Sequence, residues 1–321
     1  MKLLQSSPQR KKTPDIAVYL LPYIAALRPK QWTKNLIVFA APLFAFSINL
    51  QSFLSSLLAF VLFCCTSSSF YLFNDIVDME SDRQHPIKCH RPIAAGLVSI
   101  AAALGMALLL LCSAIVIGWI KSPGLGAALT CYALVQFAYN KKLKRTVILD
   151  IVAIATGFVL RACGGAAATN IVLSNWFLLC TAMLALFLGV EKRKAELRLT
   201  VKGGKARAVL KRYSLSLLSR MENIVTTCAI MTYAIWSSGP TFGGASTPWM
   251  LLTLPFVLYG IFRYQLLSDP DEIARRSALV SGQTERPEEV LLTDLPILFT
   301  VLSWVVTVFM ILLLKIHGVI K

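Results

Sequence analysis

Long hydrophobic stretches separated by shorter polar ones make up most of this chain. Most of the stretches approach the ~20 residues that an α-helix needs to cross the hydrocarbon core of a bilayer, where a helix satisfies its own backbone hydrogen bonds. They lie at residues 34–50, 53–73, 98–120, 123–140, 147–169, 172–190, 222–239, 248–267 and 295–316. We therefore predict an all-α, polytopic membrane protein with nine transmembrane helices in one bundle.

Composition indicates the same class of protein. Of the 321 residues, 56% are hydrophobic and only 15% are charged, so the polar residues are too few to cover one soluble globule. We predict that residues 1–33 form a cytoplasmic N-terminal segment, with a short helix over 15–27 lying along the membrane interface. Residues 34–321 are predicted to form the membrane domain.

Charged residues gather on one side of this predicted topology. If the nine helices alternate in direction, that side receives the N-terminal segment and the loops 75–97, 141–146, 191–221 and 268–294. It holds, with its boundary, all 16 carboxylates and all of the 32 Lys and Arg residues except Lys121, Arg161, Lys315 and Lys321. Because basic residues favour the cytoplasmic side, we expect an inner (plasma) membrane protein with a cytoplasmic N-terminus and active site.

The net charge of +16 has an ordinary explanation as well. Basic loops beside a membrane attract anionic lipid head groups, so the lipid bilayer is an expected partner. Nucleic acid is not an expected partner, because the charge is spread over loops and no nucleic-acid module is recognisable.

An acidic cluster follows the second hydrophobic stretch, where residues 74–82 read Asn-Asp-Ile-Val-Asp-Met-Glu-Ser-Asp. On a helix, Asp75, Asp78 and Asp82 fall within about 60° of one another, whereas Glu80 points away. Three carboxylates this close repel one another unless a cation lies among them. The cluster therefore indicates a cation site.

Magnesium suits such a site, because Mg²⁺ takes a few protein oxygens together with phosphate oxygens and water. Asn74 adds a neutral oxygen, so we predict a Mg²⁺ site completed by a substrate diphosphate and formed by Asn74, Asp75, Asp78 and Asp82. Lys88 and Arg91 follow closely and are predicted to neutralise charge on the departing diphosphate. The alternative is a solvated acidic cap paired with Arg83, Lys88 and Arg91.

A second charged segment, residues 191–196, follows the sixth stretch and reads Glu-Lys-Arg-Lys-Ala-Glu. On a helix, Lys192, Arg193 and Glu196 share one face, and Glu191, Lys194 and Arg198 share the other. The first face is expected to line a pocket while the second stays solvated. An ordinary basic end to a transmembrane helix explains the spacing equally well.

The pattern Asn74-Asp75-x-x-Asp78-x-x-x-Asp82 resembles the first aspartate motif of the UbiA superfamily of intramembrane prenyltransferases. Three further runs are similar to one branch of that superfamily, the decaprenyl-phosphate phosphoribosyltransferases. They read Arg28-Pro29-Lys30-Gln31-Trp32-Thr33-Lys34-Asn35, Asp82-Arg83-x-His85-Pro86-x-Lys88-x-x-Arg91-Pro92-Ile93-Ala94-x-Gly96 and Gly157-Phe158-Val159-Leu160-Arg161-Ala162. The resemblance covers nearly the whole chain and implies nine membrane spans around a cavity that faces the cytoplasm.

The chain departs from the quinone-type members of that superfamily in one place. Those enzymes carry a second Asp-x-x-x-Asp motif after the sixth span, where this chain has Lys192 to Glu196. Basic residues there suit a donor that brings an additional 5-phosphate. Of the superfamily's Tyr-and-Lys signature after the fourth span, Tyr139 is present and Lys144 is the nearest counterpart, because Leu143 occupies the usual lysine position.

The resemblance implies transfer of 5-phosphoribosyl from phosphoribosyl diphosphate to a polyprenyl phosphate for cell-envelope precursor synthesis, with Mg²⁺ as cofactor. It assigns catalysis to Asp75, Asp78 and Asp82. It assigns substrate binding to Lys34, Lys88, Arg91, Tyr139, Lys144, Lys192, Arg193, Glu196 and Arg263. Arg161 lies deep in the fifth span, where a structural pairing and lipid-phosphate binding are equally good explanations.

Two other functions remain open. A quinone- or haem-type prenyltransferase has the same aspartate cluster, but it moves an isoprenyl group from its diphosphate to an aromatic acceptor. A secondary transporter is the non-enzyme alternative, although transporters carry midplane charges and internal repeats, whereas the carboxylates here gather at one surface.

Overall fold

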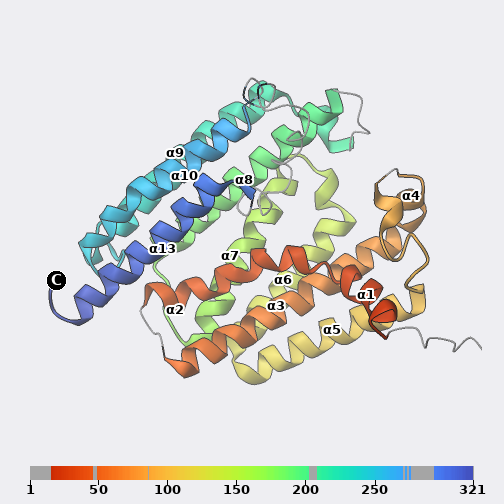
Figure 1. Cartoon of the computed structure of the whole chain (residues 1–321), viewed down its shortest axis with the longest axis horizontal. Helices are drawn as coiled ribbons and strands as arrows, with labels where there is room; N and C mark the ends of the chain where they lie inside the picture. Colours follow the sequence, from red (N-terminus) through yellow and green to blue (C-terminus); the bar gives the residue numbers. More distant parts are fainter. Residues whose placement is uncertain are drawn as a thin grey trace, which may run out of the picture. The chain divides into compact units, whose positions relative to one another are not determined.

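The computed structural model describes residues 16–45, 49–85, 87–201, 208–269, 272, 275 and 293–320. These residues form helices joined by turns, and no strand occurs among them (Figure 1). The prediction of an all-α protein is therefore confirmed for the described part of the chain. The predicted division at residues 33 and 34 stays a prediction.

The chain forms two compact units, and the smaller consists of Met1–Lys30 and Ser68–Leu109. It contains α1 (Ile16–Ala26), the C-terminal part of α3 (Leu50–Val77), α4 (Met79–Arg83), the short 3₁₀ helix η2 (Lys88–His90) and the first half of α5 (Ile100–Lys121). The Ser68 hydroxyl donates to the Leu27 carbonyl over 2.8 Å, which joins the end of α1 to α3. The predicted helix over 15–27 is present, and its interfacial position stays a prediction.

The larger unit consists of Gln31–Ser67 and Leu110–Lys321. It contains the N-terminal part of α3, the second half of α5 and most of η1 (Pro29–Phe39). Its other α-helices are α2 (Ala40–Phe44), α6 (Pro123–Lys141), α7 (Leu149–Thr169), α8 (Asn175–Val201), α9 (Leu215–Ser237), α10 (Leu254–Leu267) and α13 (Leu295–Ile316). Short 3₁₀ helices are η3 (Leu143–Arg145), η4 (Ala208–Arg212), η5 (Pro240–Phe242) and η6 (Pro248–Thr253). Helices α6 to α9 pack in chain order, and α10 packs on α9 and α13 (Figure 1).

Side-chain caps fix where several of these helices begin. Ser122 accepts from the Leu125 N–H over 3.1 Å before α6, and Ser214 accepts from the Leu217 N–H over 3.1 Å before α9. Asp294 caps α13 in the same way. A polar N-cap satisfies one of the backbone N–H groups that a helix leaves unpaired at its start. The sequence therefore sets these boundaries locally.

The first predicted span is not one regular α-helix. Residues 29–39 form the 3₁₀ helix η1, and only Ala40–Phe44 continue as α-helix. Gly165 of α7 explains how closely this segment packs, because a Cβ there would lie 2.1 Å from the Val38 carbonyl oxygen. Hydropathy alone therefore located a buried segment and misjudged its helix type.

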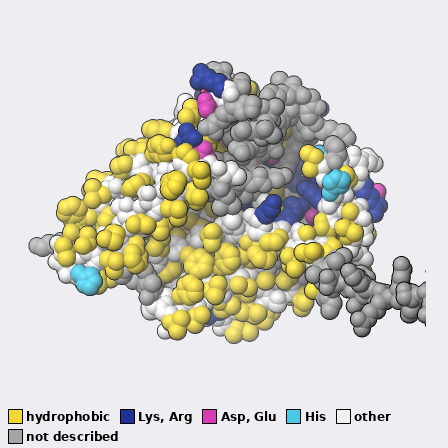
Figure 2. All heavy atoms as spheres, viewed as in Figure 1, with side chains coloured by type: hydrophobic (Ala, Val, Ile, Leu, Met, Phe, Trp, Pro, Cys, Tyr) yellow, Lys and Arg dark blue, Asp and Glu magenta, His cyan; other side chains and the backbone are white. Residues whose placement is uncertain are grey.

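Six of the described helical segments are long and apolar enough to cross a membrane, namely α3, α5, α7, α8, Pro248–Leu267 and α13. They match six of the nine predicted stretches. The stretches 123–140 and 222–239 form α6 and α9, but the count of nine crossings stays a prediction. Figure 2 shows hydrophobic side chains over much of the visible surface, as expected of a multi-pass membrane protein.

Candidate active site

The predicted aspartate cluster lies where α3 gives way to α4. Asp75 and Asp82 are each only 3% exposed, and both accept from Nη1 of Arg91, over 3.1 and 2.6 Å. Glu80 points elsewhere and pairs with Arg83 at the surface over 2.9 Å. The predicted common face is therefore confirmed for Asp75 and Asp82, as is the different direction of Glu80.

Asp78 differs slightly from its predicted setting. Helix α3 ends at Val77, and Asp78 lies at the junction with α4 rather than inside one continuous helix. The junction is small, because the Asp78 N–H still donates to the Asn74 carbonyl and the Asp82 N–H to the Asp78 carbonyl, over 2.9 and 2.8 Å. The half-buried Asp78 thus stays within two turns of the other two carboxylates.

Arg28 is a member of this cluster that sequence reasoning missed. Its guanidinium donates to Asp75 Oδ1 and lies 4.9 Å from the ring centroid of Tyr71. Its backbone adopts a left-handed conformation with φ of 56°, which is uncommon for a residue other than glycine. Arg28 and Asp75 are separated by 47 positions in the sequence, so no local pattern predicts the pairing.

The donor set of this cluster fits a divalent cation. Among the residues that the structure describes, no three acidic, His or Cys side chains already converge on one point. The Arg91 guanidinium nevertheless lies between oxygens of two nearly buried carboxylates, and such a position is one that a cation favours. Carboxylate oxygens are also the ligands that Mg²⁺ prefers. Arg91 pairs with Asp75 and Asp82, as the alternative of an acidic cap predicts, but these two carboxylates are nearly buried rather than solvated.

The turn after α4 is shaped by His85 rather than by a metal. Nδ1 of His85 accepts from the backbone N–H groups of Ile87 and Lys88, over 3.2 and 3.3 Å. The Lys88 side chain is half-buried in η2. His85 therefore forms hydrogen bonds within the loop, as expected for most histidines in such a position.

The second predicted segment lies on α8, where Arg193 and Asp150 form an ion pair in which both side chains are fully buried. Arg193 Nε donates to Asp150 Oδ2 over 2.6 Å, its Nη1 pairs with Glu196, and its Nη2 lies 3.4 Å from the Tyr139 hydroxyl. Tyr213 completes the group by donating to Asp150 Oδ1 over 2.8 Å. The direct phosphate contact predicted for Arg193 does not fit this burial, because its three nitrogens face protein groups.

The opposite face of α8 is buried too, so the expectation of a solvated face was wrong. Lys194 donates to Glu191 over 2.9 Å and pairs with Glu222 of α9, whose Oε1 accepts from Gln265 of α10 over 2.7 Å. Buried charges in proteins are usually paired. This ion-pair group joins α8, α9 and α10, and it explains why a charged segment ends a membrane helix without facing water.

Arg161 is buried in α7 with uncharged partners. Its Nε donates to Asn35 Oδ1 over 2.6 Å, and its Nη2 donates to the Tyr132 hydroxyl over 2.7 Å. The guanidinium also lies 4.5 Å from the ring centroid of Tyr132. In the described part of the chain no carboxylate forms an ion pair with it. A buried cation without an opposite charge is costly in a helix apolar enough to cross a membrane, which makes Arg161 a candidate functional residue.

The remaining predicted residues lie in several places. Lys34 donates to the side chain of Gln31 in η1, and Lys144 is half-buried in η3. Lys192 is half-buried on α8. Arg263 pairs with Asp294, the N-cap of α13, over 3.1 Å, so it ties α10 to α13 and is engaged by protein.

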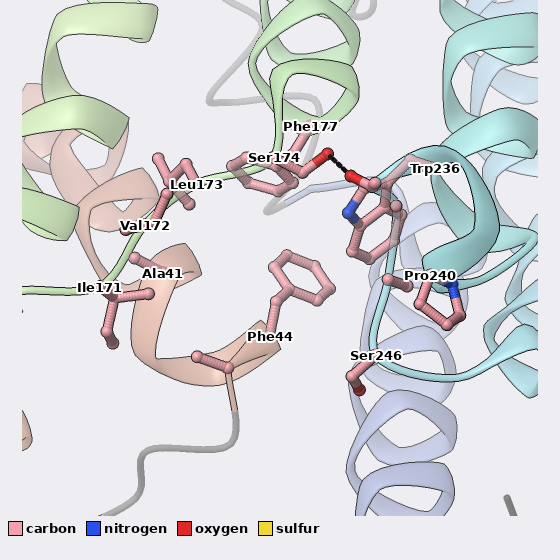
Figure 3. Close-up of a pocket in the computed structure, with 14 residues that line it drawn as sticks. Ala41, Phe44, Ile171, Val172, Leu173, Ser174, Phe177, Trp236, Pro240 and Ser246 are labelled. Carbon is pink, nitrogen blue, oxygen red and sulfur yellow. Dashed lines mark hydrogen bonds between the residues drawn. The ribbon is translucent and has the colours of Figure 1, made fainter.

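A cavity of about 400 Å³ lies at the other end of the larger unit, where α2 and α9 end and α8 begins. Phe44, Phe177 and Trp236 face its interior in Figure 3, with the Phe44 and Trp236 ring centroids 4.7 Å apart. The Ser174 hydroxyl at its rim donates to the Gly243 carbonyl. Ser174, which directly precedes α8, is nineteen residues from Arg193, or ~28 Å at 1.5 Å per residue. The cavity is therefore remote from the charged segment 191–196 of α8.

Comparison with known families decides the relationship. A family model, the UbiA prenyltransferase family, matches residues 35–282. This chain belongs to that family. UbiA family members are enzymes of membranes, so the transporter alternative is not supported, and the resemblance of the aspartate motif is confirmed at the level of the family.

Relatives within the UbiA family cover nearly the whole chain. It is 36% identical over 299 residues to a decaprenyl-phosphate phosphoribosyltransferase of Mycolicibacterium smegmatis, covering 89% of this chain and 90% of that one. A protein of the same name from Corynebacterium glutamicum is 37% identical over 300 residues, covering 89% and 85%. One from Mycobacterium tuberculosis is 34% identical over 292 residues, covering 89% and 92%.

Solved structures share the fold. A UbiA homolog from Archaeoglobus fulgidus bound to DMAPP and Mg²⁺ gives a TM-score of 0.65 at 17% identity, covering 90% of this chain and 98% of that one. A digeranylgeranylglyceryl phosphate synthase gives 0.61 at 17% identity, covering 91% and 99%. At these identities the likeness establishes a UbiA-like fold and no more.

Proposed function

We propose that this protein transfers 5-phosphoribosyl from phosphoribosyl diphosphate to a polyprenyl phosphate of decaprenyl type and releases diphosphate. The observation that carries the proposal is the relatives named decaprenyl-phosphate phosphoribosyltransferase, at 34–37% identity over 89% of the chain. Lys192, which is half-buried on α8 where quinone-type members carry a second acidic motif, supports a donor with an extra phosphate. The product belongs to the precursors of a cell-envelope polysaccharide.

The donor diphosphate is assigned to the aspartate cluster. Asn74, Asp75, Asp78 and Asp82 would hold Mg²⁺, in keeping with the donor chemistry of the cluster. When bound, the metal neutralises diphosphate oxygens and makes the diphosphate a better leaving group. Arg28 and Arg91, now paired with the aspartates, carry five N–H donors each and bind phosphate oxygens in the donor complex, with Lys88 beside them.

The acceptor phosphate is assigned to Arg161. Its guanidinium is buried among neutral groups, so an anion supplies the charge that the described chain lacks there. A phosphate monoester is largely ionised at neutral pH, with a second pKa near 6, and therefore needs no strong general base. Lys34 and Lys192 are assigned to the remaining phosphate charge, and Lys144 to the donor 5-phosphate.

The bond changes balance without a further reactant. An oxygen of the lipid phosphate attacks the anomeric carbon from the side opposite the diphosphate, a new C–O bond forms, and the bond to the diphosphate oxygen breaks with its electron pair. The anomeric carbon is inverted. Positioning and charge stabilisation supply the rate enhancement, and Glu196 accepts a hydrogen bond from a ribose hydroxyl.

We also propose that the reaction occurs on the cytoplasmic face of the plasma membrane. The distribution of Lys and Arg supports this orientation, because basic residues favour the inside. A cysteine introduced into the basic segment 208–214 and another at the exposed Phe242 should react with a membrane-impermeant maleimide from opposite sides of oriented vesicles. Labelling of both from the same side would contradict the topology.

Prenyl transfer to an aromatic acceptor is the second candidate, favoured by the fold shared with a homolog that binds DMAPP and Mg²⁺. Purified protein supplied with labelled phosphoribosyl diphosphate or labelled isoprenyl diphosphate distinguishes the two. We expect label from the first donor to enter the polyprenyl phosphate. Transfer of isoprenyl label to an aromatic acid, with none from phosphoribosyl diphosphate, would establish the second candidate instead.

A further inference from the structure

The Tyr213 hydroxyl lies between two groups at the start of α7. It accepts from the Ile148 backbone N–H over 2.7 Å and donates to Asp150 Oδ1 over 2.8 Å. Tyr213 comes from the turn between η4 and α9, 63 residues from Asp150, and is 6% exposed. Burial raises the pKa of its phenol above the usual value, so the hydroxyl keeps the proton that it donates to Asp150.

The hydrogen bond from Ile148 to Tyr213 also stabilises a strained turn. The backbone of Ile148 has φ of 71° and ψ of −48°, a conformation that a β-branched residue rarely adopts. Strain of this kind persists only where surrounding contacts hold it, and such positions cluster at functional sites. The turn directs α7 so that Asp150, in its first turn, is completely buried beside Arg193 of α8. Tyr213 therefore holds both the turn and the carboxylate.

From Asp150 the contacts continue to groups assigned to the donor. Arg193 Nε donates to Asp150 Oδ2, and its two other nitrogens face Glu196 and the Tyr139 hydroxyl. Because Arg193 is fully buried, it acts on substrate only through these partners. Charge-assisted hydrogen bonds of this kind fix orientation as well as energy.

We propose that Tyr213 is a positioning residue of the transfer reaction, because its hydroxyl fixes Asp150 and, through Arg193, sets the orientation of Glu196 and Tyr139 for the ribose phosphate. The inference rests on the proposed function. It gives the turn before α9 a role in donor binding that hydropathy and motifs do not reveal.

Replacement of Tyr213 by phenylalanine tests the inference, because it removes the hydroxyl and keeps the ring. We expect the KM for phosphoribosyl diphosphate to rise about tenfold, while the KM for the polyprenyl phosphate and the kcat change less than about threefold. Tyr233→Phe is the matched control, since Tyr233 is similarly buried and its hydroxyl accepts from Trp304 over 2.8 Å. Tyr233 lies near the C-terminal end of α9, whereas Tyr213 lies just before the start of that helix. This control should lower thermal stability by a similar amount and leave both KM values unchanged.

A double substitution separates positioning from general structural damage. If Tyr213 acts through Arg193 on Glu196, Tyr213→Phe should add no more than about twofold to the donor KM in a Glu196→Gln background. Should Tyr213→Phe fail to fold, Ile148→Gly with Tyr213→Phe replaces it, since glycine adopts the positive φ freely. Multiplicative effects, or a donor KM like that of Tyr233→Phe, would overturn the inference. A wild-type protein that transfers no phosphoribose would overturn the proposed function first.

Discussion

Replacing Arg161 by methionine should separate the activity of this enzyme from its stability. The guanidinium makes two hydrogen bonds, to Asn35 and Tyr132, at 2.6 and 2.7 Å. Hydrogen bonds from a charged donor contribute about 1.5–3 kcal/mol each. Methionine loses them, but it also removes a buried cation whose desolvation costs several kcal/mol. These opposing terms are of similar size, so we expect the melting temperature in detergent to change by only a few degrees.

Activity should respond very differently. If Arg161 binds the acceptor phosphate, its loss leaves a buried phosphate charge without its partner, at a cost of about 3–5 kcal/mol. At about 1.4 kcal/mol per factor of ten, kcat/KM for the polyprenyl phosphate should fall by at least about 100-fold. Arg161→Lys keeps the charge but loses the planar set of N–H donors of the guanidinium. Its kcat/KM should therefore lie between those of the wild type and Arg161→Met.

The assay is steady-state transfer from labelled phosphoribosyl diphosphate at varied polyprenyl phosphate, beside a thermal unfolding curve for each variant. A methionine variant that melts many degrees lower, and that recovers wild-type kcat/KM at a temperature where it is folded, would refute the assignment. Arg161 would then be a structural residue that binds Asn35 and Tyr132 and nothing else.

Three further predictions concern the aspartate cluster, Arg28 and Arg263. Asp75→Asn or Asp78→Asn should abolish Mg²⁺-dependent turnover while the protein stays folded. Glu80→Ala should leave turnover nearly unchanged, because Glu80 forms only a surface ion pair. An equal loss of turnover in Glu80→Ala would contradict the geometry of the cluster. Arg28→Gln should tighten Mg²⁺ binding to the donor-free protein about fivefold, because a pair worth about 1 kcal/mol no longer competes for Asp75. Unchanged or weaker binding in a calorimetric Mg²⁺ titration without donor would exclude that competition. Arg263→Gln should lower the free energy of unfolding by about 1 kcal/mol, because it removes the ion pair between Arg263 and Asp294. Both KM values should stay within threefold of the wild type. A tenfold rise in either KM would support the substrate contact that the sequence predicted for Arg263.

Hydropathy located the helices well because each apolar stretch carries its own signal. The stretch 295–316 coincides with α13, and 147–169 differs from α7 by two residues at its start. The stretch 34–50 was assigned the wrong helix type, because its close packing on Gly165 depends on a residue far away in the chain. Local sequence therefore predicts where a helix lies better than how it packs.

The spacing of the aspartate motif also predicted part of its geometry, whereas nothing local in the sequence predicted which residues pair with the charged side chains of the site. Spacing predicted that Asp75 and Asp82 share a face and that Glu80 does not. It could not predict that Arg28 pairs with Asp75, or that Asp150 and Tyr213 bury Arg193, because those contacts join segments tens of residues apart. Asp150 gave one local signal of such a contact, because it lies near the start of an apolar stretch and a charge there needs a partner.

The most direct test of the central claim is a transfer assay with purified protein, ribose-labelled phosphoribosyl diphosphate and decaprenyl phosphate, with and without Mg²⁺ and with Asp75→Asn beside the wild type. We predict labelled lipid only from the wild-type protein with Mg²⁺, together with an equal amount of diphosphate. Label in the lipid without Mg²⁺, or from Asp75→Asn at the wild-type rate, would contradict the claim that the aspartate cluster activates the donor.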